Sequence, residues 1–224
     1  VRTMTEKAHA VGAKMLIDGA QSIQHKKIDV RDINCDFFVF SGHKVFGPTG
    51  IGVLYGKEAI LDEMPPYQGG GDMIAKVSFE KTTYNELPFK FEAGTPHIAG
   101  AICLGTAIQY LNTLDMDAVL RYEADLADYA EGLLDTFEGL RIIGQAKKKT
   151  SVVSFVIDGI HPFDLGTLLD KQGIAVRTGH HCTQPLMDFY KIPGTTRASF
   201  AFYNTKEEID IFIGAVERAI SMLK

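Results

Sequence analysis

The sequence lacks an excess of basic residues, a dense cysteine pattern and a long apolar run. Lys and Arg number 23 against 28 Asp and Glu, and the resulting net charge of −5 argues against a nucleic-acid-binding protein. Cys35, Cys103 and Cys182 lie far apart, so they indicate neither a disulfide framework nor a CxxC zinc site. No apolar run approaches the roughly 18 residues of a membrane span. We therefore expect a cytoplasmic protein that binds neither nucleic acid nor membrane.

The sequence also lacks a clear beginning. Residues 1–4 contain no hydrophobic signal segment and have the pattern of a helix interior, with no capping residue before it. We expect a further segment upstream of them. The 224 residues suffice for one large domain or two small ones.

Helical patterns and short apolar runs alternate in the first half of the chain. A helix over residues 3–12 precedes the apolar run 13–17, which stops at Asp18, and a buried strand over 35–40 leads to Ser41 and Lys44. This alternation predicts an α/β fold with a mainly parallel sheet. Ligands bind such sheets at the carboxyl ends of the strands, so we expect Asp18 and Lys44 at one rim. An antiparallel strand is expected over 51–55 and a long loop over 63–94.

A smaller α+β unit is expected to close the chain. A helix over 97–112 is expected before a domain boundary near Leu114, and beyond it we expect helices over 115–138 and 162–172 and strands over 151–158 and 197–203. The last helix begins with a capping box formed by Thr205 and Glu208. Cys35 and Cys103 lie in apolar stretches and are expected in the core, and Lys147-Lys148-Lys149 is expected to be a solvated turn.

Asp18 and Lys44 suggest chemistry at the predicted rim. A buried carboxylate needs a partner, and a protonated pyridine nitrogen is one, although a helix cap or turn better explains Asp18 taken alone. A lysine in a crevice can lose its proton and form an imine with an aldehyde, whereas most such lysines extend to water. Ser41 and His43 place a hydroxyl and an imidazole within reach of a phosphate.

Cys182 differs from the other cysteines because its neighbours are polar. A reactive thiolate needs nearby positive charge, and Arg177, His180 and His181 would supply it. Without further context, an incidental surface thiol explains Cys182 equally well. The adjacent histidines also suggest a metal site, but no second ligand pair stands at the usual spacing, so we expect none.

Together these motifs resemble the class V aminotransferase-like enzymes that use pyridoxal 5′-phosphate (PLP). The segments Asp18-Gly19-Ala20-Gln21-Ser22 and Ser41-Gly42-His43-Lys44 carry this resemblance. Within that group, Arg177-Thr178-Gly179-His180-His181-Cys182 is similar to the SufS-type (group II) cysteine desulfurases, as are residues 91–96 and 196–199. The resemblance covers essentially the whole chain. It implies the fold-type I transferase fold, with part of the large PLP-binding domain over 1–114 and a small C-terminal α+β domain, carrying the cysteine loop, over 115–224.

The resemblance also implies residue roles. Lys44 would hold PLP, Asp18 would pair with its pyridine nitrogen, and Gln21 would hydrogen-bond its phenolic oxygen. Ser41 and His43 would bind the phosphate. Thr95 would reach the phosphate in the partner subunit of a homodimer with shared active sites. Arg197 would bind the carboxylate of L-cysteine, and Arg177 would position the substrate or the cysteine loop. Cys182 would take the sulfur as a persulfide and pass it to an acceptor protein of the SufE or SufU type for iron–sulfur cluster assembly.

The resemblance leaves alternatives open. Relatives of this kind carry a long segment before the region present here, with a side chain that stacks on PLP and an asparagine near the substrate. Residues 1–224 alone are therefore expected to bind PLP weakly, because a sheet cut through its middle exposes a strand edge. A selenocysteine lyase and an aminotransferase are rivals on the same scaffold, and a catalytically incomplete dimerisation or acceptor-binding remnant is a third.

Overall fold

The chain forms two compact units. The structure is a computed structural model that describes residues 1–147 and 149–224, so the expected turn at 147–149 includes one residue, Lys148, outside the described ranges. The units are Val1–Met116 and Asp117–Lys224, and each is described here by itself. The helices and strands of the first unit are α1 (Arg2–Ala10), β1 (Leu16–Asp18), α2 (Val30–Ile33), β2 (Phe37–Ser41), the 3₁₀ helix η1 (Gly42–Val45), β3 (Gly52–Gly56), α3 (Glu58–Glu63), β4 (Ile74–Val77), β5 (Thr82–Tyr84), the 3₁₀ helix η2 (Phe89–Phe91) and α4 (Ile98–Leu111).

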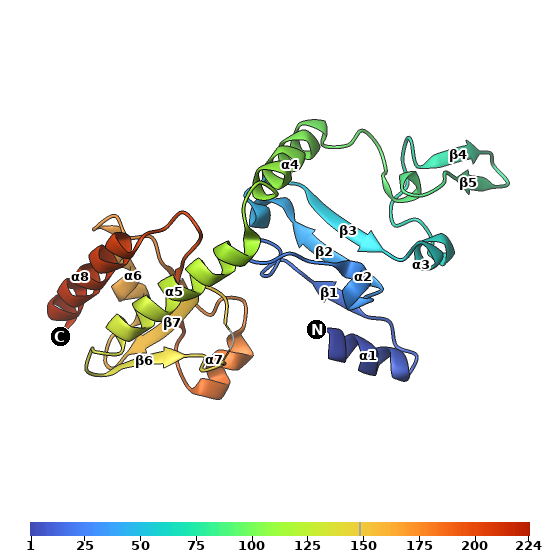
Figure 1. The fold of residues 1–224 in the computed structure, drawn as a ribbon. Helices are drawn as coiled ribbons and strands as arrows, with labels where there is room; N and C mark the ends of the chain where they lie inside the picture. Colours follow the sequence, from blue (N-terminus) through green and yellow to red (C-terminus); the bar gives the residue numbers. More distant parts are fainter. Residues whose placement is uncertain (148) are drawn as a thin grey trace. The chain divides into compact units, whose positions relative to one another are not determined.

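The central sheet of the first unit has the strand order β1-β2-β3 (Figure 1). β1 and β2 are parallel, with Asp18 opposite Val39. β3 returns antiparallel to β2, with Tyr55 opposite Phe38. The antiparallel strand expected over 51–55 is thereby confirmed. The α/β pattern expected from the sequence brings the ends of β1 and β2 to one edge.

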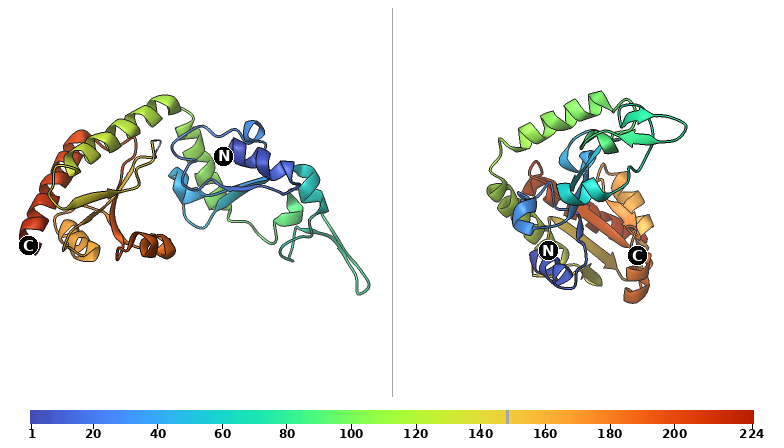
Figure 2. Two further views of the ribbon diagram at one scale, coloured as in Figure 1. Left: turned by 90° about the horizontal axis from the view of Figure 1, so that it is seen from below. Right: turned by 90° about the vertical axis from the view of Figure 1, so that its right-hand side faces the viewer.

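The expectation of a long loop over 63–94 is wrong in part. β4 and β5 pair as an antiparallel hairpin, and the hairpin extends away from the β1-β2-β3 sheet (Figures 1 and 2). Its strands are short and mostly exposed, so neither shows the alternation of apolar and polar residues that marks a half-buried strand. Met73, just before β4, is fully buried and anchors the base of the hairpin.

The expectation that Cys103 lies in the core is also wrong, because this residue is exposed. α4 is apolar around most of its circumference, but it buries Gly100, Leu104 and Leu111 and leaves Ile102 66% exposed. The apolar context of Cys103 therefore did not imply burial. Cys35, in contrast, is fully buried as expected.

Asp36 stabilises the beginning of β2 from inside the first unit. Its Oδ2 accepts hydrogen bonds from the Met15 backbone N–H at 2.7 Å and from His9 Nε2 at 2.8 Å, and its Oδ1 lies 3.2 Å from Lys57 Nζ. Burial raises the pKa of this carboxyl, but the bonds from Met15, His9 and Lys57 outweigh it and lower the pKa to about 2. The charged form is therefore favoured in the folded chain.

Replacing Asp36 with Asn is expected to lower the free energy of unfolding at neutral pH by about 2 kcal/mol, the typical value of a buried hydrogen bond to a charged group. Because the folded-state pKa lies below the ordinary value of 3.8, the contribution is complete above about pH 4 and disappears as the pH falls towards 2. Urea titrations at pH 7 and pH 3 measure this difference. Asp62→Asn, a change at an exposed carboxyl, is the control and should alter stability by less than about 0.5 kcal/mol. An equal loss in both variants would contradict the assignment.

The second unit is an antiparallel sheet covered by helices. Its elements are α5 (Met116–Leu134), which begins at the boundary, β6 (Leu140–Ile143), β7 (Val152–Ile157), α6 (Pro162–Asp170), β8 (Arg177–Gly179), α7 (Gln184–Tyr190), β9 (Thr195–Ser199) and α8 (Lys206–Leu223). The strand order is β6-β7-β9-β8, with antiparallel pairing throughout. Leu126 of α5, Phe155 of β7, Leu165 of α6 and Phe212 of α8 belong to one buried cluster. α5 and α8 lie side by side (Figures 1 and 2).

The ends of several elements differ from the sequence expectation. The strand expected over 197–203 is β9, which begins two residues earlier at Thr195 and ends at Ser199. α5 ends at Leu134 rather than 138. The capping box of Thr205 and Glu208 is confirmed, with both reciprocal hydrogen bonds present. Within the described residues, no helix combines the length and the apolar character needed to cross a membrane.

Candidate functional site

The ends of β1 and β2 form one rim in the first unit. Asp18 is the last residue of β1, and the next residue, Gly19, donates its N–H to the Val39 carbonyl at 2.8 Å before the chain leaves the sheet. β2 ends two residues beyond Val39, at Ser41, and continues directly into η1, which contains Lys44. Because β1 and β2 are parallel, their carboxyl ends meet at the same edge. Asp18 and Lys44 therefore emerge at one rim.

Two glycines keep this rim closely packed. A Cβ atom at Gly19 would lie 2.0 Å from Cζ of Phe38, and one at Gly42 would lie 2.9 Å from Cγ2 of Ile51. Gly42 N–H also donates to the Ile51 carbonyl at 2.8 Å, which ties the start of η1 to the chain before β3. A larger residue at either position would have to displace Phe38 or Ile51, so both turns favour glycine.

The polar side chains at the rim have free bonding capacity. The Asp18 carboxylate is exposed, and its Oδ1 accepts the Ala20 backbone N–H at 2.9 Å. Ser41 is the N-cap residue of η1, yet its hydroxyl makes no capping hydrogen bond. Lys44 is half-buried, whereas Gln21 and His43 are exposed. The rim thus presents a carboxylate, a hydroxyl, an imidazole, an amide and an amine.

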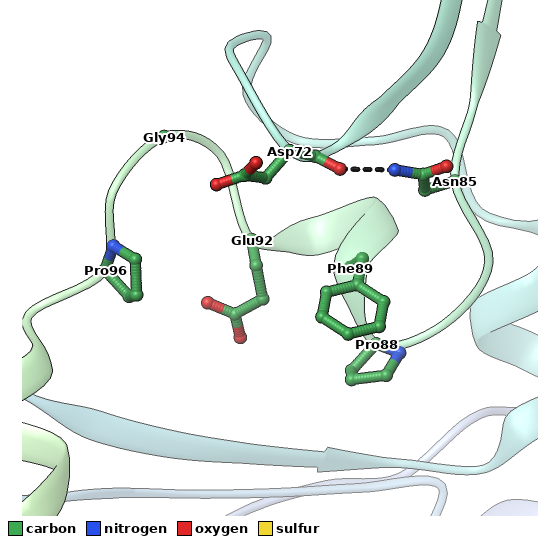
Figure 3. Close-up of a pocket in the computed structure, with 7 residues that line it drawn as sticks. All are labelled: Asp72, Asn85, Pro88, Phe89, Glu92, Gly94 and Pro96. Carbon is green, nitrogen blue, oxygen red and sulfur yellow. Dashed lines mark hydrogen bonds between the residues drawn. The ribbon is translucent and has the colours of Figure 1, made fainter.

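Thr95 lies in the same unit, between two residues that line a pocket of about 550 Å³. Gly94 and Pro96, its two neighbours, line this pocket, and Thr95 itself is exposed. The other lining residues are Asp72, Asn85, Pro88, Phe89 and Glu92. Figure 3 shows the Glu92 carboxylate pointing into the open space between Pro96 and Pro88. Asn85 donates to the Asp72 carbonyl and joins the base of the hairpin to the wall of this pocket.

Cys182 lies in a tight loop after β8 in the second unit. Its side chain is exposed, and its Sγ lies 4.0 Å from Nη2 of Arg177. His181 and Cys182 both have left-handed backbone angles, with φ of 52° and 63°. Thr183 closes the loop by donating its N–H and its hydroxyl to the His180 carbonyl at 2.9 and 2.8 Å. The loop thus holds the exposed thiol next to a guanidinium group.

Arg197 is the second cation of this region. It stands directly opposite Arg177 in the pairing of β8 with β9. Burial, followed by the charge of Arg177, lowers the pKa of the Arg197 guanidinium. Its Nε is buried and has no hydrogen-bond partner among the described residues. A buried, unpaired donor is costly.

The sequence predicted His181 as a source of positive charge for Cys182, and its position in the structure does not support this. Its Nε2 lies 2.8 Å from the Thr195 hydroxyl and 3.1 Å from the Thr195 carbonyl. The two residues are separated by 13 others, so no local spacing indicates the contact. Burial, followed by the charge of Arg197, lowers the pKa of His181, and this favours the neutral imidazole.

The chain belongs to the class-V aminotransferase family. The family pattern matches residues 1–212, which is nearly the whole chain.

Several relatives within this family are named cysteine desulfurases. The cysteine desulfurase of Serratia proteamaculans (strain 568) is 48% identical over all of this chain, which covers 55% of the relative. A probable cysteine desulfurase of Halalkalibacterium halodurans is 52% identical over 97% of this chain, with 53% of the relative covered. The crystal structure of the Escherichia coli cysteine desulfurase CsdA matches the whole chain with a TM-score of 0.95 and 42% identity, over 55% of that protein. The chain thus spans about half the length of these relatives.

Proposed function

We propose that this chain is the C-terminal part of a PLP-dependent cysteine desulfurase, which converts L-cysteine to L-alanine and forms a persulfide on Cys182. The observation that carries the proposal is the exposed Cys182 thiol, whose Sγ lies 4.0 Å from a guanidinium nitrogen of Arg177. The names of the relatives at about 50% identity support the same reaction. An aminotransferase has no need of a nucleophilic thiol in this position.

The rim of the first unit fits PLP by the chemistry of its side chains. Lys44 would hold the cofactor covalently through Nζ, and the Asp18 carboxylate would pair with the pyridine nitrogen. The uncommitted Ser41 hydroxyl and the exposed His43 would bind the phosphate, while Gln21 would donate to the phenolic oxygen. When bound, PLP supplies an electron sink for the substrate. Asp18 strengthens that sink by keeping the ring nitrogen protonated.

The second unit would supply the substrate and sulfur chemistry. Arg197 would bind the L-cysteine carboxylate through its guanidinium group, whose planar geometry suits bidentate binding. Arg177 would stabilise the Cys182 thiolate. The thiolate attacks the sulfur of the substrate, a new S–S bond forms, and the substrate Cβ–S bond breaks. The carbon fragment keeps the electron pair, takes a proton from Lys44 Nζ and leaves as L-alanine.

The proposal includes partners. Thr95, exposed on a loop, would reach the phosphate bound by the partner subunit, so the enzyme would act as a homodimer with shared sites. The persulfide would pass to an acceptor protein of the SufE or SufU type, for iron–sulfur cluster assembly. The reaction needs a reduced Cys182, which the cytoplasm maintains.

A selenocysteine lyase is the nearest alternative, because selenium in place of sulfur uses the same carboxylate and thiol contacts. A steady-state assay of alanine release by the full-length protein, with L-cysteine and L-selenocysteine in parallel, tests the proposal. We expect release from both substrates, with persulfide on Cys182 only from L-cysteine. Release from L-selenocysteine alone would show a lyase instead. No release from either substrate would favour a catalytically incomplete protein.

A further inference from the structure

The His181 side chain anchors the cysteine loop to β9. Thr195, its partner, is 1% exposed and is the first residue of that strand. The Thr195 carbonyl can only accept a hydrogen bond, so the 3.1 Å contact requires the proton on His181 Nε2. In that tautomer one N–H serves the carbonyl and the hydroxyl together, which accounts for both distances. His181 Nδ1 is then a bare acceptor; it is buried and has no partner among the described residues.

The anchor ties the loop to the strand face that carries Arg197. Residues two apart on a strand point to the same side, so Thr195 and Arg197 share a face of β9. Arg177 is directly opposite Arg197 on β8 and therefore projects from the same face. The intervening residue Thr196 is 1% exposed and stands opposite Phe155, in the buried core. The imidazole thus attaches the loop to the polar face, next to both guanidinium groups.

The loop needs such an anchor because its backbone is strained. His181 and Cys182 are consecutive non-glycine residues in the left-handed region, and each costs roughly 1–2 kcal/mol in that conformation. The bonds from Thr183 to the His180 carbonyl hold the loop only to itself. Among the described side chains of 180–183, it is His181 that makes a hydrogen bond to β9.

We propose that His181 is a positioning residue, which holds the Cys182 thiol beside Arg177 by donating from Nε2 to Thr195. The inference rests on the proposed function, because it assigns His181 to the sulfur-transfer step. Without the bond, the loop relaxes from its left-handed turn and the thiol loses its fixed place beside Arg177. The Arg197 guanidinium stays on β9, so carboxylate binding is retained while sulfur transfer slows.

His181→Leu and His181→Gln in the full-length protein test the proposal. Leucine removes the N–H, whereas the glutamine Nε2 can still donate to Thr195. Two rates are measured: alkylation of Cys182 by iodoacetamide, followed by peptide mass spectrometry, and alanine release from L-cysteine. For His181→Leu we expect both alkylation and kcat to fall roughly three- to tenfold, the effect of one net hydrogen bond, with KM unchanged. His181→Gln should restore both to within about twofold of the wild type.

Two further variants complete the test. Thr195→Val changes the other partner of the contact, because it removes the hydroxyl but keeps the carbonyl. It should lower the alkylation rate and kcat less than His181→Leu does. Gln184→Leu, an exposed change two residues beyond Cys182, is the matched control and should leave both rates unchanged.

The outcomes separate this inference from the proposed function. The anchor would be overturned if His181→Leu kept the wild-type alkylation rate and kcat. It would also be overturned if His181→Gln lowered both rates as much as His181→Leu. If alkylation of Cys182 depends on His181 but the wild type releases no alanine, the anchor stands and the desulfurase proposal fails.

Discussion

Replacing Lys44 with alanine is expected to lower alanine release from L-cysteine by roughly 10²- to 10⁴-fold, the usual contribution of a positioned proton donor or acceptor. The proposed covalent hold on PLP through Nζ would disappear with the amine, so the visible absorbance of the protein should fall as well. Steady-state kinetics and an absorbance spectrum of the full-length variant measure the two effects. The fold itself should persist, because Lys44 is half-buried and lies in the short η1.

Lys44→Arg is the matched control for this prediction. Arginine keeps the positive charge beside Ser41 and the phosphate but has no amine that can lose its proton near neutral pH. We expect Lys44→Arg to be as inactive as Lys44→Ala. If arginine restored turnover, Lys44 would act only as a charge, and the role proposed for Nζ would be wrong.

Replacing Cys182 with alanine is expected to lower alanine release from L-cysteine by a factor on the order of 10³ or more, as with other covalent nucleophiles. The loss arises because no other group then takes the substrate sulfur. Absorbance from PLP should remain, since the rim residues Asp18, Ser41 and Lys44 are unchanged. Activity and persulfide content, measured on the same preparation, report the two effects together.

Cys103→Ala provides the control for Cys182→Ala. Cys103 is also an exposed thiol, but it lies on α4 and is assigned no role. Its replacement should leave alanine release within about twofold of the wild type, as for most surface substitutions. An aminotransferase would behave differently, because Cys182→Ala would then leave turnover intact. If alanine release fell equally in the two cysteine variants, the effect of Cys182→Ala would not be specific to that thiol, and the persulfide on Cys182 would be unsupported.

The rim of the first unit could be predicted from the sequence because short apolar runs stop abruptly at polar residues. Asp18 ends one such run and Ser41 the next, and parallel pairing of β1 with β2 follows from the alternating pattern. The residue types alone left the chemistry open, and the PLP roles were inferred from the resemblance of these motifs to the class V family. The hairpin of β4 and β5 was missed, since its strands bury little and carry no period-2 pattern.

The tertiary details of the cysteine loop could not be predicted from the sequence. Cys182 was identified by its polar neighbours, but the left-handed turn at His181 and Cys182 has no sequence signature, because glycine or asparagine usually occupies such positions. The bond from His181 to Thr195 joins residues in different elements, and it exists only once β8 and β9 have paired. The exposure of Cys103 is a similar case, since an apolar helix such as α4 does not reveal which of its faces is covered.

The most direct test of this account is borohydride reduction of the PLP-loaded full-length protein, followed by peptide mass mapping. Borohydride makes a lysine–PLP linkage permanent, so the modified residue can be identified independently of turnover. We predict a pyridoxyl group on the peptide that contains Lys44, and a lower yield of this group in Asp18→Ala, because the carboxylate proposed to pair with the ring nitrogen is then absent. Modification of a different lysine, or of none in a protein that nevertheless releases alanine from L-cysteine, would contradict the central claim.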